Sequence, residues 1–77
     1  MKSYEEMRAY TIAYHNGMID SFKFSFDCID HIKMLQNQAI GRINLAQNLD
    51  LITKEEEKTF LQEIDDAYAE AVEQFYA

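Results

Sequence analysis

The chain has 77 residues, 48% of them hydrophobic, with five tyrosines and five phenylalanines. This size and composition predict one globular domain, residues 1–77, with a small core of the kind that often gains stability from oligomerisation or from a partner. The chain has two glycines and no proline, which argues against an all-β protein with its many turns. A net charge of −7 disfavours direct binding to nucleic acid or to an anionic membrane.

Cysteine content and hydropathy indicate the cellular compartment. Cys28 is the single cysteine, so an internal disulfide is excluded and a reducing compartment is favoured. The first ten residues lack the apolar run of a signal peptide. No stretch approaches the 18 or so apolar residues that a membrane span needs. A cytoplasmic protein is therefore expected.

A first helix is expected to begin at Ser3, where Ser3 and Glu6 form the Ser-x-x-Glu pattern of a capping box. Asn16-Gly17 is expected to end it, because both residues tolerate the left-handed conformation that follows a helix. An apolar stripe at spacings of three and four is suited to packing: Tyr4, Met7, Tyr10, Thr11 and Tyr14.

The segment from Asn16-Gly17 onward also fits a hairpin. Asn-Gly is a strong turn signal, and Phe22, Phe24 and Phe26 alternate with polar residues at the period of a strand. A small α+β fold with a hairpin around Asn16-Gly17 is therefore the alternative to an all-α fold. The pattern of residues 17–27 fits both the period of a helix and the period of a strand.

A long second helix is expected over residues 21–48. Its apolar residues form a continuous seam: Ile29, Ile32, Leu35, Ala39, Ile43, Ala46 and Leu49. Gly41 either costs this helix about 1 kcal/mol relative to alanine or allows another helix to approach closely.

A turn over residues 48–52 leads to a third helix that Thr53 and Glu56 cap as a second capping box. Acidic residues 55–57 then lie where the positive end of the helix dipole favours them. The rest of this helix has a regular amphipathic pattern: Phe60, Leu61, Ile64, Ala67, Tyr68, Ala71, Val72 and Phe75. The whole pattern predicts a compact three-helix bundle with a long central helix.

Residues 43–68 run helix, Asn-Leu-Asp-Leu-Ile-Thr-Lys-Glu-Glu-Glu, helix. This segment resembles the helical hairpins of small uncharacterised accessory proteins of phages and mobile elements. Asp50 stands where glycine is common in that turn. The resemblance implies a phage-type accessory protein and carries no active site.

The net charge is confined to one part of the chain. Residues 1–49 hold five acidic and five basic residues, whereas residues 50–77 hold nine acidic residues against Lys54 and Lys58. Four of these acids are spaced to form one ridge of the third helix, opposite its apolar stripe: Glu63, Asp66, Glu70 and Glu73. Like charges at such spacings slightly destabilise their own helix. The ridge is therefore either a solvated acidic face or a binding surface for a basic partner, and the two interpretations stay open.

Two aromatic residues are candidate anchors for a partner, Phe24 and Tyr76. In a helix, Phe22 and Phe26 share a face that Phe24 cannot reach. Phe24 is therefore expected either to be exposed as an anchor or to pack against the first helix.

No catalytic, cofactor or metal site is predicted. Cys28 and His31 lie one helical turn apart, but a structural zinc site needs four ligands and the only other histidine is His15. No orienting group or phosphate loop accompanies them. The chain is therefore not expected to be an enzyme.

The sequence thus predicts a small acidic protein-binding regulator or inhibitor. Its partner is expected to be a larger protein with a basic, nucleic-acid-binding surface, which the acids would occupy as a nucleic-acid mimic. The alternative is a structural homo-oligomer, for instance a homodimer, or a subunit of a larger assembly.

Overall fold

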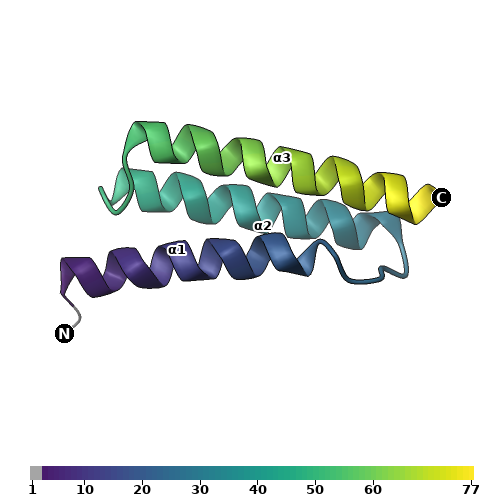
Figure 1. Cartoon of the computed structure of the whole chain (residues 1–77), viewed down its shortest axis with the longest axis horizontal. Helices are drawn as coiled ribbons and strands as arrows, with labels where there is room; N and C mark the ends of the chain where they lie inside the picture. The colour runs from purple at the N-terminus through teal and green to yellow at the C-terminus, as the bar shows by residue number, and fades with distance from the viewer. Residues whose placement is uncertain (1–2) are drawn as a thin grey trace.

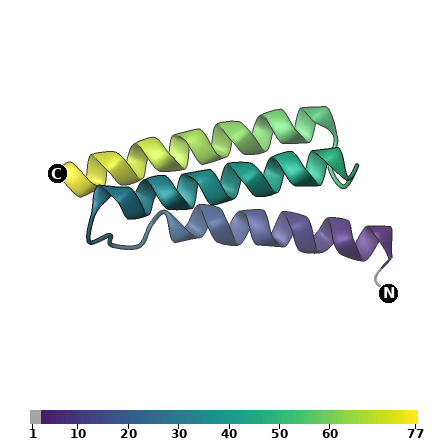
Figure 2. The same ribbon diagram turned by 180° about the vertical axis from the view of Figure 1, so that it is seen from behind.

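The computed structural model describes residues 3–77 and contains three α-helices, α1 (Tyr4–Ser21), α2 (Ile29–Asn48) and α3 (Lys54–Tyr76). Successive helices run in opposite directions, and both views draw α2 between α1 and α3 (Figures 1 and 2), while α1 also contacts α3 directly. The bundle measures 43 × 23 × 15 Å. No strand occurs in residues 3–77, so the all-α three-helix bundle is confirmed and the hairpin alternative is wrong.

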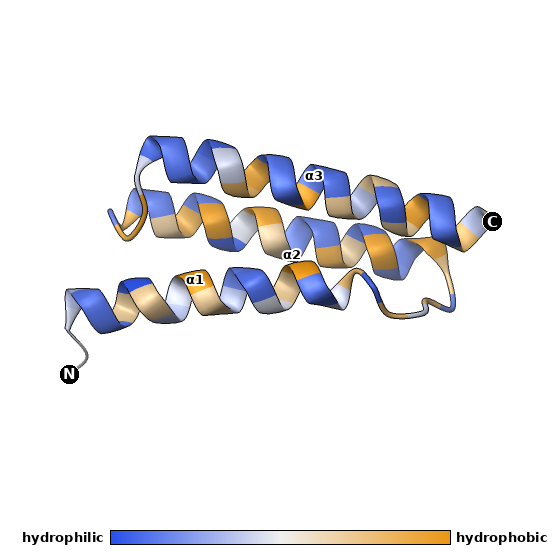
Figure 3. Ribbon diagram, viewed as in Figure 1, coloured by the Kyte–Doolittle hydropathy of each residue, from blue (hydrophilic) through white to orange (hydrophobic). Residues whose placement is uncertain are grey.

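The core lies mainly between α2 and α3, which contact each other more extensively than α1 contacts either. Ile32, Ile43 and Ile64 are its largest fully buried side chains. Figure 3 shows hydrophobic residues of α3 on the side toward α2 and hydrophilic residues on the outer side. The central helix is not the longest one, since α2 has 20 residues and α3 has 23.

The first helix does not end at Asn16-Gly17. Helix α1 continues to Ser21, which brings His15 and Met18 onto its buried side and leads Phe22, the residue that follows it, into the core. A glycine inside a helix costs about 1 kcal/mol relative to alanine. Burying Met18 and Phe22 contributes about 1.5–3 kcal/mol each, so tertiary packing outweighs the local signal to stop.

The second helix begins later than expected. Residues 22–28 form an irregular connection, and α2 starts at Ile29 with Cys28 in the N-cap position, where its side chain makes no capping hydrogen bond. The reversal that the chain needs between two antiparallel helices falls here because α1 has extended through Gly17 (Figure 1).

Two parts of the expected apolar pattern are exposed. In the stripe of α1, Tyr4, Met7 and Tyr10 are more than a third exposed, and Leu49 is exposed at the end of the seam of α2. A Cβ at Gly41 would meet no atom within 4 Å, so this glycine does not serve the close approach of another helix.

The turn between α2 and α3 is a Schellman motif. The N–H of Asp50 donates to the carbonyl of Gln47 (3.0 Å), and the N–H of Leu51 donates to the carbonyl of Ala46 (2.9 Å). Asp50 has a φ of 58°, the left-handed conformation that favours glycine and that aspartate tolerates better than most residues. This conformation explains why a glycine is common at that point of such turns.

Candidate protein-binding site

The first turn of α3 is fixed by hydrogen bonds that the sequence predicts. Thr53 Oγ1 accepts from the N–H of Glu56 (3.1 Å), and Glu56 Oε1 accepts from the N–H of Thr53 (2.9 Å). The expected capping box is therefore confirmed. It fixes where α3 begins and hence which side each later acid occupies.

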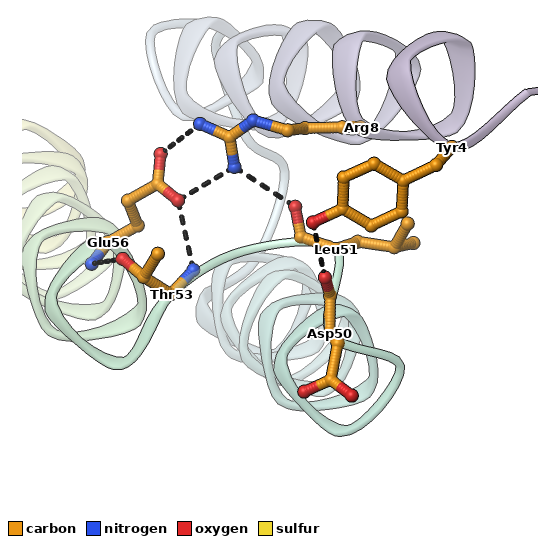
Figure 4. Close-up of polar contacts among 6 residues, drawn as sticks. All are labelled: Tyr4, Arg8, Asp50, Leu51, Thr53 and Glu56. Carbon is orange, nitrogen blue, oxygen red and sulfur yellow. Dashed lines mark hydrogen bonds and ion pairs between the residues drawn. The ribbon is translucent and has the colours of Figure 1, made fainter.

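An ion pair attaches α1 to this turn (Figure 4). The guanidinium of Arg8 donates to both carboxylate oxygens of Glu56, at 2.7 and 2.6 Å, and to the carbonyl of Leu51 at 3.0 Å. The Tyr4 hydroxyl donates to the carbonyl of Asp50 at 2.6 Å. One end of the bundle is thus held by polar contacts between α1 and the α2–α3 turn.

The same contacts lower the pKa of Glu56. The hydrogen bond from Arg8, followed by that from the Thr53 backbone, brings the pKa of this carboxyl to about 2 from its ordinary 4.5. Glu56 is therefore ionised at neutral pH and engaged within the fold. Its charge stabilises the protein itself and is not free for a partner.

A second polar contact joins α1 to the middle of α3. His15 is buried, and its Nε2 lies 2.9 Å from Glu63 Oε1. The imidazole also packs on the ring of Phe60, with centroids 4.4 Å apart. A carboxylate oxygen accepts hydrogen bonds, so the contact assigns Nε2 as the donor. Glu63 is thereby held in place while its side chain stays 49% exposed.

The remaining acids of the ridge, Asp66, Glu70 and Glu73, are exposed along α3. Asp66 accepts a hydrogen bond from Gln62 Nε2 at 2.9 Å within the same helix. No basic residue follows Lys58 in the chain. The four acids therefore do not have the same environment: Glu63 is tied to α1, and the other three face outward.

Three of the four acids line a groove of about 650 Å³ between the end of α1, the 22–28 connection and α3. We call it the acid–phenylalanine groove. One wall carries Glu63, Asp66 and Glu70; the other includes Phe24 and Phe26. Glu73 is not among its lining residues. The structure thus brings most of the sequence-predicted site together with one predicted anchor.

The two predicted anchors occupy different places. Phe24 is 71% exposed and lines the acid–phenylalanine groove, so its expected exposure is confirmed, and its role as an anchor stays a prediction. Tyr76 is 70% exposed at the end of α3, where its ring packs edge-on against Phe75 at 5.1 Å. It does not line the groove.

Sequence analysis missed Arg8 and His15, whose side chains make polar contacts from α1 to α3. His15 lies three residues before Met18 and seven before Phe22, a helical spacing that continues through Gly17. Recognising that period would have revealed both the length of α1 and a buried histidine. No sequence pattern pairs Arg8 with Glu56, since 48 residues separate them.

Among residues 3–77, no three histidine, cysteine, aspartate or glutamate side chains lie together as a potential metal site. No helix in that range is long and apolar enough to cross a membrane. Comparisons with protein-family models, with characterised proteins and with solved structures found no significant match to this chain. Its function therefore has to be inferred from its own residues.

Proposed function

We propose that the protein is a small acidic regulator or inhibitor that binds a larger protein and performs no catalysis. The observation that carries this proposal is the grouping of Glu63, Asp66 and Glu70 beside the exposed ring of Phe24. The acids supply long-range attraction to a basic surface, and the ring supplies a short-range apolar contact. Together they form the pattern of a docking site with an aromatic anchor.

The basic surface that such a protein occupies is one that otherwise binds nucleic acid. The ridge acids follow one another at spacings of three, four and three residues, so they rise along the helix by about 4.5–6 Å per step. A protein that presents carboxylates in this way competes with phosphates for lysine and arginine side chains. Association of this type is fast and weakens as salt is added. A phage or mobile-element origin, suggested by the hairpin of residues 43–68, suits such an inhibitor.

The test is capture of partners from nuclease-treated lysate of the source, with elution in steps of salt. We expect release of a nucleic-acid-handling protein at moderate salt. A variant that neutralises the whole ridge should capture much less: Glu63→Gln, Asp66→Asn, Glu70→Gln and Glu73→Gln.

The control variant removes the same number of charges from exposed positions away from the ridge: Glu5→Gln, Glu6→Gln, Asp30→Asn and Asp65→Asn. It should retain the partner. Equal capture by the ridge variant and the wild type contradicts the proposal, because the ridge would then contribute nothing.

A second candidate function, assembly of the chain with itself, is favoured by an apolar face between α1 and α2. Tyr10, Leu45 and Leu49 are each more than half exposed there. They line a small hollow of about 110 Å³ whose lining includes no carboxylate. Two copies of a chain with net charge −7 repel each other least through such a face.

Sedimentation of two variants tests self-assembly. The sequence placed the contact at Phe24, whereas the exposed apolar face lies at Leu45 and Leu49. If the α1–α2 face joins two copies, Leu45→Ser with Leu49→Ser yields monomers and Phe24→Ser leaves the assembly intact. A wild-type chain that is monomeric at all concentrations and salt levels contradicts this candidate.

A further inference from the structure

The acid–phenylalanine groove is large and concave. Its volume of about 650 Å³ falls within the roughly 300–1,000 Å³ typical of sites that enclose a ligand. A flat basic surface contacts only the rim of such a groove. A protruding segment of chain can place several side chains inside it.

The lining of the groove has a net negative charge. Glu63, Asp66 and Glu70 contribute three carboxylates, and Lys23 contributes the one cation among the lining residues. Lys23 Nζ lies 3.6 Å from Asp20 Oδ1 on its own segment. The groove therefore favours a cationic occupant, which would meet the carboxylates of α3.

Apolar surface adjoins these charges. Ala67 and Ala71 lie among the acids of α3 and have side chains small enough to admit a neighbouring group closely. Phe24, Phe26 and Phe75 add aromatic surface. Lysine and arginine pack their hydrocarbon stems on such surface while their charged heads reach a carboxylate or an aromatic face.

The spacing of the acids also matches a helix or a peptide. Glu63, Asp66 and Glu70 lie at positions i, i+3 and i+7, which span about 10 Å along α3. A partner helix alongside α3 meets all three with cations at the same spacing. Glu73 and Tyr76, outside the groove lining, are not needed for this contact.

We infer that the acid–phenylalanine groove binds a single cationic amphipathic segment of the partner protein, with lysine or arginine at helical spacing beside large apolar side chains. This inference rests on the proposed function and names the chemistry of the partner at that site. It differs from simple charge attraction because it requires the apolar side chains as well as the cations.

Two synthetic peptides test it. Each has about 15 residues, enough for a helix of about 22 Å, with lysines at positions i, i+3, i+7 and i+10. One peptide carries leucines on the adjacent stripe, and the other carries serines at the same positions. Calorimetric titration of the full chain should give a dissociation constant about tenfold lower for the leucine peptide than for the serine peptide.

Two matched pairs of substitutions locate the site on α3. Asp66→Asn with Glu70→Gln removes two charges from the groove, and Asp65→Asn with Glu73→Gln removes two from the same helix outside its lining. We expect the groove pair to weaken binding of the leucine peptide by about tenfold and the outer pair by less than about threefold. Phe24→Ser changes an exposed position. It should raise the dissociation constant of the leucine peptide by about tenfold and leave that of the serine peptide unchanged.

Each other outcome overturns the inference. If the two peptides bind equally, or if the groove pair and the outer pair of substitutions lower the affinity for the leucine peptide equally, the attraction depends on total charge. The proposed function then still stands. No binding of the leucine peptide also overturns the inference, and the ridge variant in the capture experiment then decides the proposed function separately. If the ridge variant retains the partner as well, both fail.

Discussion

The acids at the two ends of α3 carry the same charge but have different effects on the protein. Those of the first turn, residues 55–57, lie at the positive end of the helix dipole, and Glu56 also completes the capping box and binds Arg8. Asp66, Glu70 and Glu73 lie further along, without that favourable field and next to one another. Acidic charge therefore stabilises the fold at the start of α3, whereas the acids further along make no hydrogen bond or ion pair with another helix within residues 3–77 and are the ones that we propose bind a partner.

Glu63 lies between the two groups. It pairs with buried His15 as a structural residue does, yet its side chain is 49% exposed and lines the acid–phenylalanine groove. Substitutions at and around Glu63 would test whether the acids that stabilise the fold are distinct from those that we propose bind a partner.

The largest effect is expected from Glu63→Leu. It leaves the Nε2–H of buried His15 without an acceptor, which costs about 1–3 kcal/mol in the free energy of unfolding. Glu63→Gln keeps an acceptor oxygen and should cost less. Urea denaturation measures both.

A double variant checks the cause of that loss. Removing both polar partners, His15→Phe with Glu63→Leu, should recover much of the stability, because no buried polar group then remains unpaired. His15→Phe alone completes the cycle. If the loss of stability in the double variant equals the sum of the losses in His15→Phe and Glu63→Leu, the His15–Glu63 contact does not account for the effect of Glu63→Leu.

The next largest effect is expected from Glu56, whose contribution to the stability of the fold should depend on pH. Its pKa is about 2 in the folded chain against an ordinary 4.5, so the folded state holds its proton less tightly than the unfolded state. The stabilisation is complete above about pH 4.5 and is lost as the pH falls from there toward about 2. Glu56→Gln should lower Tm at neutral pH, and its difference from wild type should shrink across that window. A difference that is constant with pH contradicts the assignment.

A smaller effect is expected from Thr53→Ala, which removes the acceptor for the N–H of Glu56. Loss of an N-cap residue costs about 1 kcal/mol, or about 4–8 °C in Tm for a domain of this size. Thr59→Ala, an exposed position inside α3, is the control and should cost little. Equal losses at the two positions would show that the cap is unimportant.

The smallest effect on stability is expected in the groove. Asp66→Asn with Glu70→Gln removes a like-charge pair at i and i+4 and should raise the free energy of unfolding by a few tenths of a kcal/mol. The same variant should lose partner binding. A stability loss above about 1 kcal/mol would place these acids with the structural group.

The sequence was most informative where local chemistry is decisive. The cap at Thr53, the amphipathic pattern of α3 and the turn before it all follow from neighbouring residues, and the structure confirms them. The same pattern placed the ridge acids on one side of α3. The sequence could not show that Phe24 would lie opposite them, because the groove joins segments about 40 residues apart.

The sequence was misleading where local and tertiary preferences compete. Asn16-Gly17 is a good place to end a helix, and Tyr4, Met7 and Tyr10 form a plausible packing stripe. Packing against α2 and α3 instead continues α1 through Gly17 and buries the side that carries His15 and Met18.

Composition, caps and hydrophobic periodicity alone thus determined an all-α chain, the start of α3 and the concentration of acid along it. These properties depend on residues within one or two helical turns of each other. Only the tertiary structure decided the length of α1, the irregular connection at 22–28, the pairing of His15 with Glu63 and the groove that faces Phe24. Those features depend on burial between segments far apart in the chain, where a few kcal/mol of packing exceeds the smaller local preferences.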